Sequence, residues 1–296
     1  MKDKIVESSV DEIMGAPVDI SNFNEDTCSR IAFDLYKEAM TAVTVVCGLC
    51  SPDDKSEYIY ERNQAMIIGL LVRIVKLMAS VTSLSVDKVK EHGEVILALN
   101  RNIVESAINV IYFCTKARSE DFDNFIKSAF KAEKNLFNSI QENIKQRGKA
   151  LPIEERMLKS IDRLFKASEI KGIKDLEQIP RWKDYKTILR EIDLEWAYPV
   201  LQQIPSHSIH GTWSDIAMHH IEYNGEKFSA KLESIRIDAR LLSPISKLVS
   251  IALKSYLEKY YGDVENHPLL LRVNDLIERN EKIEKMHEEI LSKGKK

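Results

Sequence analysis

The stretch Val95–Cys114, VILALNRNIVESAINVIYFC, decides the fold that this sequence predicts. It is almost entirely apolar, so it predicts a helix that is buried on nearly all sides at the centre of a helical domain. Arg101 and Glu105 are its two charged residues, and a spacing of four places them on one helix face. Burying either charge alone would cost on the order of several kcal/mol, so both side chains need polar partners.

Helical periodicity continues on both sides of this stretch. The apolar run Ala65–Val81 contains Arg73 and Lys76, which favours a core helix over a helix that crosses a membrane. One Asn-Gly turn, Asn224–Gly225, lies between apolar residues and is typical of a β-hairpin. We therefore expect an all-α protein, a multi-helix bundle with at most one short β-hairpin.

Three segments are expected along the chain. Residues 1–22 hold scattered polar residues, Gly and Pro, which predicts a loosely ordered N-terminal arm. Residues 23–262 form the helical bundle. Residues 263–296 form a C-terminal helix that packs on the bundle or on a partner. Its apolar residues approximate a heptad seam around Asn280; they are Leu269, Val273, Leu276, Ile283 and Ile290.

The charge distribution bears on the partners that the chain can have. The formal net charge of −3 argues against a protein that coats nucleic acid generally. The segment Lys116–Arg190 nevertheless carries 18 Lys and Arg against 12 Asp and Glu. By itself, this local excess is more typical of ordinary solvated helix faces, and it leaves RNA as a candidate partner.

Neither the N-terminus nor the cysteines suggest an extracellular protein. The sequence MKDKIVESSVDEIMG is charged and has no apolar core of a secretory signal. Four cysteines without such a signal are typical of a reducing compartment, so we expect a cytoplasmic protein that is not membrane-bound.

Arg101 and Glu105 allow two interpretations. In one, they form a polar network that fixes the register of the helices, with Arg73 on the preceding helix as a further partner. In the other, they form the floor of a site, where Arg101 binds an anionic group and Glu105 orients it or moves a proton.

A second polar stretch is SHSIHGTWSDIAMHH, from Ser206 to His220. Thr212 and Asp215 fit a capping box, and Gly211 allows the backbone to turn just before it. His210 would then lie at a helix N-terminus, which favours anions. The alternative is a structural histidine with satisfied hydrogen bonds.

Several kinds of site are not supported by the sequence. His219 and His220 are adjacent and point in different directions, and no acidic ligands stand at metal spacing, so we expect no metal site. The pair Cys47 and Cys50 forms a C-x-x-C that ends a helix, which indicates ordinary thiols rather than a redox motif. No glycine-rich phosphate loop and no G-x-S-x-G occur, and we expect no cofactor.

Two of these stretches together resemble a known family. The segment NRNIVESAINVIYFC, preceded by RNQAMIIGLLVRIVKLMASV and followed by SHSIHGTW, resembles a bacterial family of all-helical domains of unknown function. Its members carry an R-x-x-x-E helix and a later H-G-[ST] element, which Arg101, Glu105, His210 and Gly211 match here. That family is similar to the higher-eukaryote-and-prokaryote nucleotide-binding (HEPN-like) helical superfamily, many of whose members are RNases in toxin and phage-defence systems. The R-x(4–6)-H spacing of the superfamily does not occur in the central helix of this chain.

Two functions follow as hypotheses. The resemblance implies an effector of a bacterial toxin or phage-defence system, a metal-independent RNase with Arg101, Glu105 and His210 as catalytic residues. Its substrate-binding residues would be Arg73, Ser208 and Ser214. The alternative is a non-catalytic helical module that binds a protein partner, or a second copy of itself, through the C-terminal helix.

Overall fold

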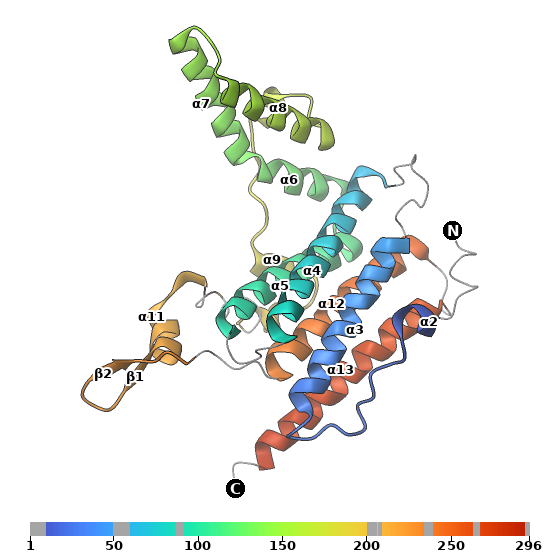
Figure 1. The fold of residues 1–296 in the computed structure, drawn as a ribbon. Helices are drawn as coiled ribbons and strands as arrows, with labels where there is room; N and C mark the ends of the chain where they lie inside the picture. The colour runs from blue at the N-terminus through green and yellow to red at the C-terminus, as the bar shows by residue number, and fades with distance from the viewer. Residues whose placement is uncertain are drawn as a thin grey trace. The chain divides into compact units, whose positions relative to one another are not determined.

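The computed structural model describes residues 10–49, 60–86, 92–199, 206, 209–233, 239–262 and 267–293. Over these residues it is built from helices and one two-stranded antiparallel hairpin (Figure 1), so the predicted all-α class is confirmed. The chain divides into two compact units. Unit 1 comprises Met1–Lys116 and Tyr185–Lys296, and unit 2 comprises Ala117–Asp184.

Unit 1 is organised around α5 (Gly93–Thr115), which packs against α4 (Arg62–Val86) and α12 (Ala239–Tyr261). In turn, α12 packs against α3 (Cys28–Leu49) and α13 (Pro268–Lys293). Shorter elements complete the unit: α2 (Val10–Met14), α9 (Tyr185–Glu191), η2 (Glu195–Ala197), α11 (Trp213–Asp215), η4 (Ile216–His220), β1 (Ile221–Tyr223) and β2 (Phe228–Ala230).

The central position expected for the 95–114 stretch is borne out by its burial. The side chains of Ile103, Ile108 and Phe113 are fully buried in α5. A buried polar group on the helix also finds partners. Asn100 donates a hydrogen bond to the carbonyl of Leu241 at 3.2 Å and accepts one from the hydroxyl of Tyr36 at 3.3 Å.

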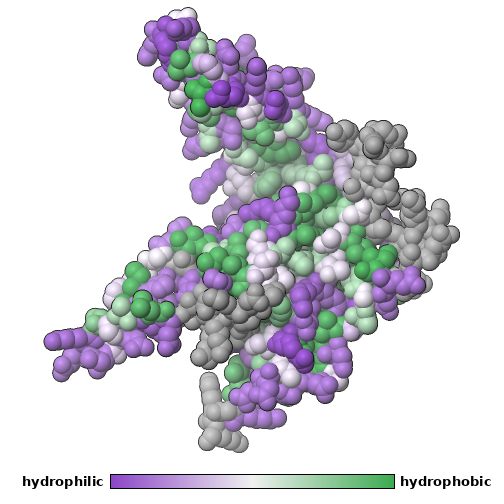
Figure 2. All heavy atoms as spheres, viewed as in Figure 1, coloured by the Kyte–Doolittle hydropathy of each residue, from purple (hydrophilic) through white to green (hydrophobic). Residues whose placement is uncertain are grey.

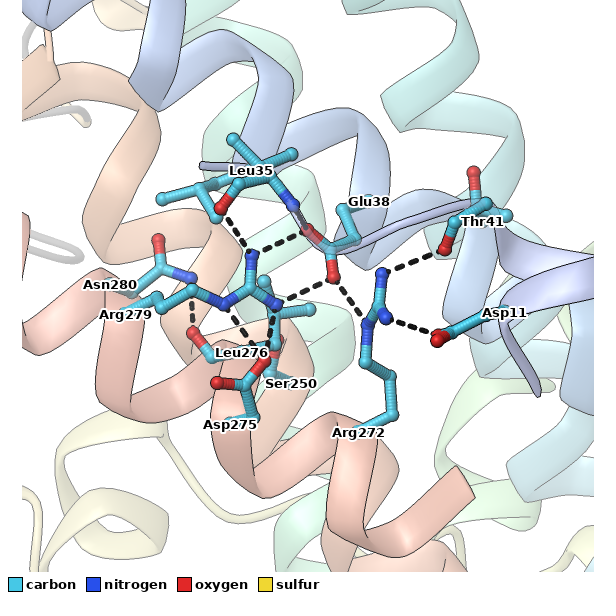
Figure 3. A network of polar contacts seen from close by, with 12 residues as sticks. Asp11, Leu35, Glu38, Thr41, Ser250, Arg272, Asp275, Leu276, Arg279 and Asn280 are labelled. Atoms are coloured by element: carbon cyan, nitrogen blue, oxygen red, sulfur yellow. Dashed lines mark hydrogen bonds and ion pairs between the residues drawn. The ribbon is translucent and has the colours of Figure 1, made fainter. Parts of the chain in front are cut away.

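A buried carboxylate joins α3 to α13 (Figure 3). The Glu38 side chain is 4% exposed and lies against two arginines of α13. Its Oε1 accepts hydrogen bonds from Arg272 Nε and Arg279 Nη2, both at 2.7 Å, and its Oε2 accepts one from Arg279 Nη1 at 2.7 Å. Asp11 and Asp275 pair with the outer sides of the same guanidiniums, each at 2.7 Å.

The same arginines hold the segment before α3. Arg272 donates to the carbonyl of Gly15 at 3.0 Å, and Arg279 donates to the carbonyl of Val18 at 3.2 Å. The Val18 amide donates to Glu38 Oε2 at 3.1 Å. Two buried arginines therefore bind the backbone of residues 10–18, within the segment for which a loosely ordered arm is predicted.

The C-terminal helix α13 buries its apolar seam within unit 1. Leu269, Val273, Leu276 and Ile283 are at most 2% exposed. Asn280 is fully buried and donates to the carbonyl of Leu276 at 2.8 Å. Of the two packings considered for this helix, the structure shows packing on its own unit.

Unit 2, which lies within the 23–262 segment predicted to form the helical bundle, has a small core of its own. It contains α6 (Ser119–Ala129), α7 (Lys131–Arg147), α8 (Pro152–Ala167) and η1 (Ile173–Leu176). Its core cluster consists of Phe130, Ile161, Phe165, Ile170 and Leu176. The apolar faces of these helices therefore pack against one another.

One helix is apolar enough to cross a membrane by length and composition. Among the described residues, Arg62–Ser85 of α4 has a mean hydropathy of 1.9 over its most apolar window, of which 28% is buried. A core helix of a soluble protein passes the same test, so this property alone decides nothing about a membrane.

Replacing the buried carboxylate is expected to destabilise unit 1 strongly. Glu38→Gln leaves the cations of Arg272 and Arg279 without their shared counter-charge, which typically costs about 3–5 kcal/mol when a buried ion pair loses one partner. Chemical denaturation should show this loss in the free energy of unfolding. The control Asp34→Asn removes an exposed pair with Lys37 and should change that free energy by less than about 0.5 kcal/mol.

The same carboxylate makes the stability depend on pH. Burial raises the pKa of Glu38, but hydrogen bonds and charge from Arg279, then Val18 and Arg272, outweigh it and hold the pKa below 4.5. The stabilisation is therefore present above pH 4.5 and is lost as the pH falls through the lower, folded-state pKa. A Glu38→Gln protein that shows the same acid-unfolding profile as the wild type would contradict this assignment.

Candidate functional site

The best candidate site is a group of polar side chains on α4, α5 and α9 of unit 1, together with Ser206. We call it the polar cluster. Its members are Arg73, Arg101, Asn102, Glu105, Ser106, Asn109, Tyr185 and Ser206.

Arg101 and Glu105 form the pair that their spacing predicts. Arg101 Nε donates to Glu105 Oε1 at 3.1 Å, and the two side chains are 20% and 22% exposed. Arg101 Nη1 also donates to the hydroxyl of Ser206 at 3.3 Å, across 105 residues of sequence. The structure thus places the first residue of the Ser206–His220 stretch beside the charged pair of α5.

Arg73 crosses from α4 to α5. It donates to the carbonyl of Asn102 at 3.1 Å, to Asn102 Oδ1 at 2.8 Å, and to the hydroxyl of Ser106. Asn102 and Ser106 are one turn apart on α5, so a single guanidinium fixes the register of the two helices here. Arg73 is exposed in spite of these hydrogen bonds, so solvent still reaches its side chain.

Tyr185, at the start of α9, was not singled out from the sequence. Its hydroxyl accepts a hydrogen bond from Asn109 Nδ2 at 3.3 Å. Burial raises its pKa to about 12, and the charge of Glu105 adds to the rise, while Asn109, Arg73 and Arg101 oppose it. Tyr185 therefore lies in the same electrostatic field as the predicted residues.

The residues predicted on the 206–220 stretch have different outcomes. Gly211 has a φ of +56° and turns the backbone before α11, as its position suggested. His210 and Ser214 are exposed, and within the part of the chain that is described the structure records no hydrogen bond from His210 to Arg101 or Glu105. Ser208 lies outside the described residues, and the facing of His210 toward Arg101 stays a prediction.

An unexpected pair forms further along this stretch. His220 Nε2 lies 3.3 Å from Asp215 Oδ2, with the Asp215 side chain 4% exposed and the His220 side chain 47% exposed. The π-helical turn η4 brings together residues that are five apart, a spacing that an α-helix separates. Among the described residues, no group of three or more His, Cys, Asp or Glu is arranged to hold a metal ion.

The polar cluster is suited to binding an anion. Two guanidiniums and one carboxylate leave an excess of positive charge, and planar guanidiniums bind phosphate or carboxylate groups through paired hydrogen bonds. The hydroxyls of Ser206 and Tyr185 add neutral hydrogen-bonding groups beside them.

The partial exposure of Arg101 and Glu105 predicts how substitutions act. Glu105→Gln and Arg101→Met should each lower the free energy of unfolding by less than Glu38→Gln does, because solvent reaches these side chains, which are 20% and 22% exposed, and screens the pair. Denaturation of both proteins measures this. A loss as large as that expected for Glu38→Gln would instead make the pair a structural network.

The titration of Tyr185 tests the geometry of the polar cluster. Glu105→Gln removes a negative charge, so the pKa of Tyr185 should move down from about 12. Nuclear magnetic resonance of tyrosine labelled at Cζ would follow the phenol directly. Tyr260, whose pKa is raised by burial and by Cys114, serves as the control and should keep its pKa in this protein.

One family model matches the part of the chain that holds the polar cluster. Residues 64–228 match the model of a family of unknown function, DUF5677. The matched segment includes nearly all of α4, all of α5 and unit 2, and the first strand of the hairpin, and so contains every member of the polar cluster. No curated protein matches the chain, and no solved structure does. Because the match covers more than half of its residues, the chain belongs to the DUF5677 family.

Proposed function

We propose that this protein binds RNA at the polar cluster and cleaves it without a metal ion, as an effector of a bacterial toxin or phage-defence system. One observation carries the proposal. The contact between Arg101 and Ser206 joins the charged pair of α5 to the stretch that contains His210. This contact supports a site in which Arg101 binds phosphate and His210, four residues after Ser206, transfers the proton.

The proposed roles follow from the chemistry of each group. Arg101, assisted by Arg73, binds a phosphate of the RNA and stabilises its charge as the 2′-hydroxyl attacks. Glu105 holds the Arg101 guanidinium in position. His210 accepts the proton of the 2′-hydroxyl, and the 5′ oxygen leaves with a proton from the solvent. The products are a 2′,3′-cyclic phosphate and a 5′-hydroxyl.

Charge and resemblance support RNA as the substrate. The basic excess over Lys116–Arg190 would attract a phosphate backbone. The R-x-x-x-E helix and the later H-G-[ST] element resemble a family similar to the HEPN-like superfamily, which contains many RNases. We place the protein in the cytoplasm, where such effectors meet their RNA.

A second candidate is a non-catalytic interaction module. It is favoured by the aromatic side chains of Trp213, Tyr223 and Phe228, which are 57–64% exposed on the hairpin and its preceding turn. In that case, the polar cluster fixes the packing of α4, α5 and α9 and carries no chemistry.

Cleavage of labelled RNA distinguishes the two candidates. With excess chelator present, the wild-type protein should convert a single-stranded RNA to products with 2′,3′-cyclic ends. His210→Ala should slow this reaction roughly 10²–10⁴-fold, the usual contribution of a general base. Arg101→Met should slow it by roughly 10²-fold or more through the loss of charge stabilisation.

Two further variants complete this experiment. His92→Gln, outside the polar cluster and the Ser206–His220 stretch, is the matched control and should cleave at the wild-type rate. His220→Asn tests the rival pair with Asp215, and a loss confined to this variant would move the catalytic histidine away from the proposed position. The absence of cleavage in the wild type, or its abolition by the chelator, would contradict the proposed reaction.

A further inference from the structure

Residues Ile209–Glu233 form an element that we call the arm. It contains α11, η4 and the hairpin, in which Tyr223 pairs with Phe228. Its large apolar side chains lie at the surface, and Figure 2 shows apolar surface along it. The most exposed are Trp213 (64%), Met218 (64%), Tyr223 (61%), Phe228 (57%) and Leu232 (95%).

The arm lacks a core that would explain these side chains. Trp213 and Tyr223 contact the ring of Phe228 with centroids 6.1 Å and 4.8 Å apart, but none of the three is buried. Asp215 is the buried residue of the described arm, and it is polar. An isolated two-stranded hairpin is only marginally stable, and grouped exposed apolar side chains mark interaction sites.

The outer face of α4 is a second surface without a described partner within the chain. Its residues are spaced by four and three, opposite the buried face of the helix, and most are small; they are Ala65, Gly69, Val72, Lys76, Ala79 and Ser83. A Cβ added to Gly69 would meet nothing within 4 Å. No other described part of the chain therefore approaches the helix closely at this glycine.

The two surfaces complement each other in size and charge. Large aromatic side chains of the arm suit the small residues of α4. The exposed arm residues Glu222, Glu226 and Glu233 suit a helix that carries Arg62 and Lys76 and has no acidic residue. Most of both surfaces lies within the family match over residues 64–228.

We propose that the arm of one copy packs on the outer face of α4 of a second copy, and that the second copy returns the same contact. Such an exchange closes a two-fold dimer and covers both apolar surfaces of each chain. The proposal concerns assembly, and it stands whether or not the polar cluster cleaves RNA.

RNA is a less suitable occupant of the arm. The arm carries four acidic residues, Asp215, Glu222, Glu226 and Glu233, against Lys227 and Lys231. A net negative surface repels a phosphate backbone, although exposed aromatic rings could otherwise stack on bases. A protein surface with an excess of cations suits the arm better, and α4 provides one.

Sedimentation equilibrium of the full chain tests the proposal. The wild-type protein should sediment as a dimer. Gly69→Phe should raise the dissociation constant by about tenfold or more, because it fills the face on which the arm packs. The monomer should stay folded, since the site is open and a glycine inside a helix is replaced by a better helix former. Phe228→Ser should also weaken the dimer, because it removes an exposed aromatic side chain from the arm.

Controls and charge reversal make the test specific. Leu271→Ser changes an exposed apolar residue of α13 and should leave the dimer intact. Lys76→Glu should weaken the dimer, and adding Glu222→Lys should restore part of the affinity. Far-ultraviolet circular dichroism checks the fold of each variant.

Three results would overturn the proposal. The first is a wild-type protein that sediments as a monomer. The second is a Gly69→Phe protein that is folded and dimerises as tightly as the wild type. The third is a Lys76→Glu, Glu222→Lys protein that dimerises no more tightly than Lys76→Glu alone. If Phe228→Ser reduces the binding of a single-stranded RNA while the sedimentation of the protein is unchanged, the arm is instead a platform for RNA bases.

Discussion

The buried carboxylate of Glu38 is the interaction on which the arrangement of unit 1 depends. Taking this charge out of water is unfavourable by itself, so its position requires both Arg272 and Arg279, and each arginine in turn requires a second carboxylate. These five charged groups form one network, because each of its three central members, Glu38, Arg272 and Arg279, would be a buried charge without a partner if the others were removed. The result is a frame in which α3, α13 and residues 10–18 have fixed positions relative to one another (Figure 3).

This frame explains why the polar cluster can remain partly open. Helix α12 packs on α3 and α13 and presents its other contacts to α5, so the central helix is anchored from that direction. The side of α5 that carries Arg101 and Glu105 meets α4, α9 and Ser206 through hydrogen bonds. Arg101 and Glu105 are 20% and 22% exposed, so solvent reaches the pair at which we propose that an anion binds.

The sequence predicts those features that have a local signal. The apolarity of the 95–114 stretch implies its central place, the Asn-Gly turn implies the hairpin, and a spacing of four implies the pair Arg101 and Glu105. The partners of Glu38 are 234 and 241 residues away, and no local pattern indicates them. The separate core of unit 2 was missed because amphipathic periodicity shows that a face is buried and does not show against what. Tyr185 begins a short helix without a motif, and Asp215 meets His220 only because a π-helical turn changes the spacing.

The proposed function depends on the binding of RNA at the polar cluster. Photo-crosslinking of a single-stranded RNA that contains 4-thiouridine, followed by mass spectrometry of the attached peptides, measures this directly. We expect crosslinks to Tyr185 or to residues 206–210, and their loss in Arg101→Met, whose fold is expected to be intact. Crosslinks confined to unit 2, or an unchanged set of crosslinks in that variant, would contradict the binding of RNA at the polar cluster.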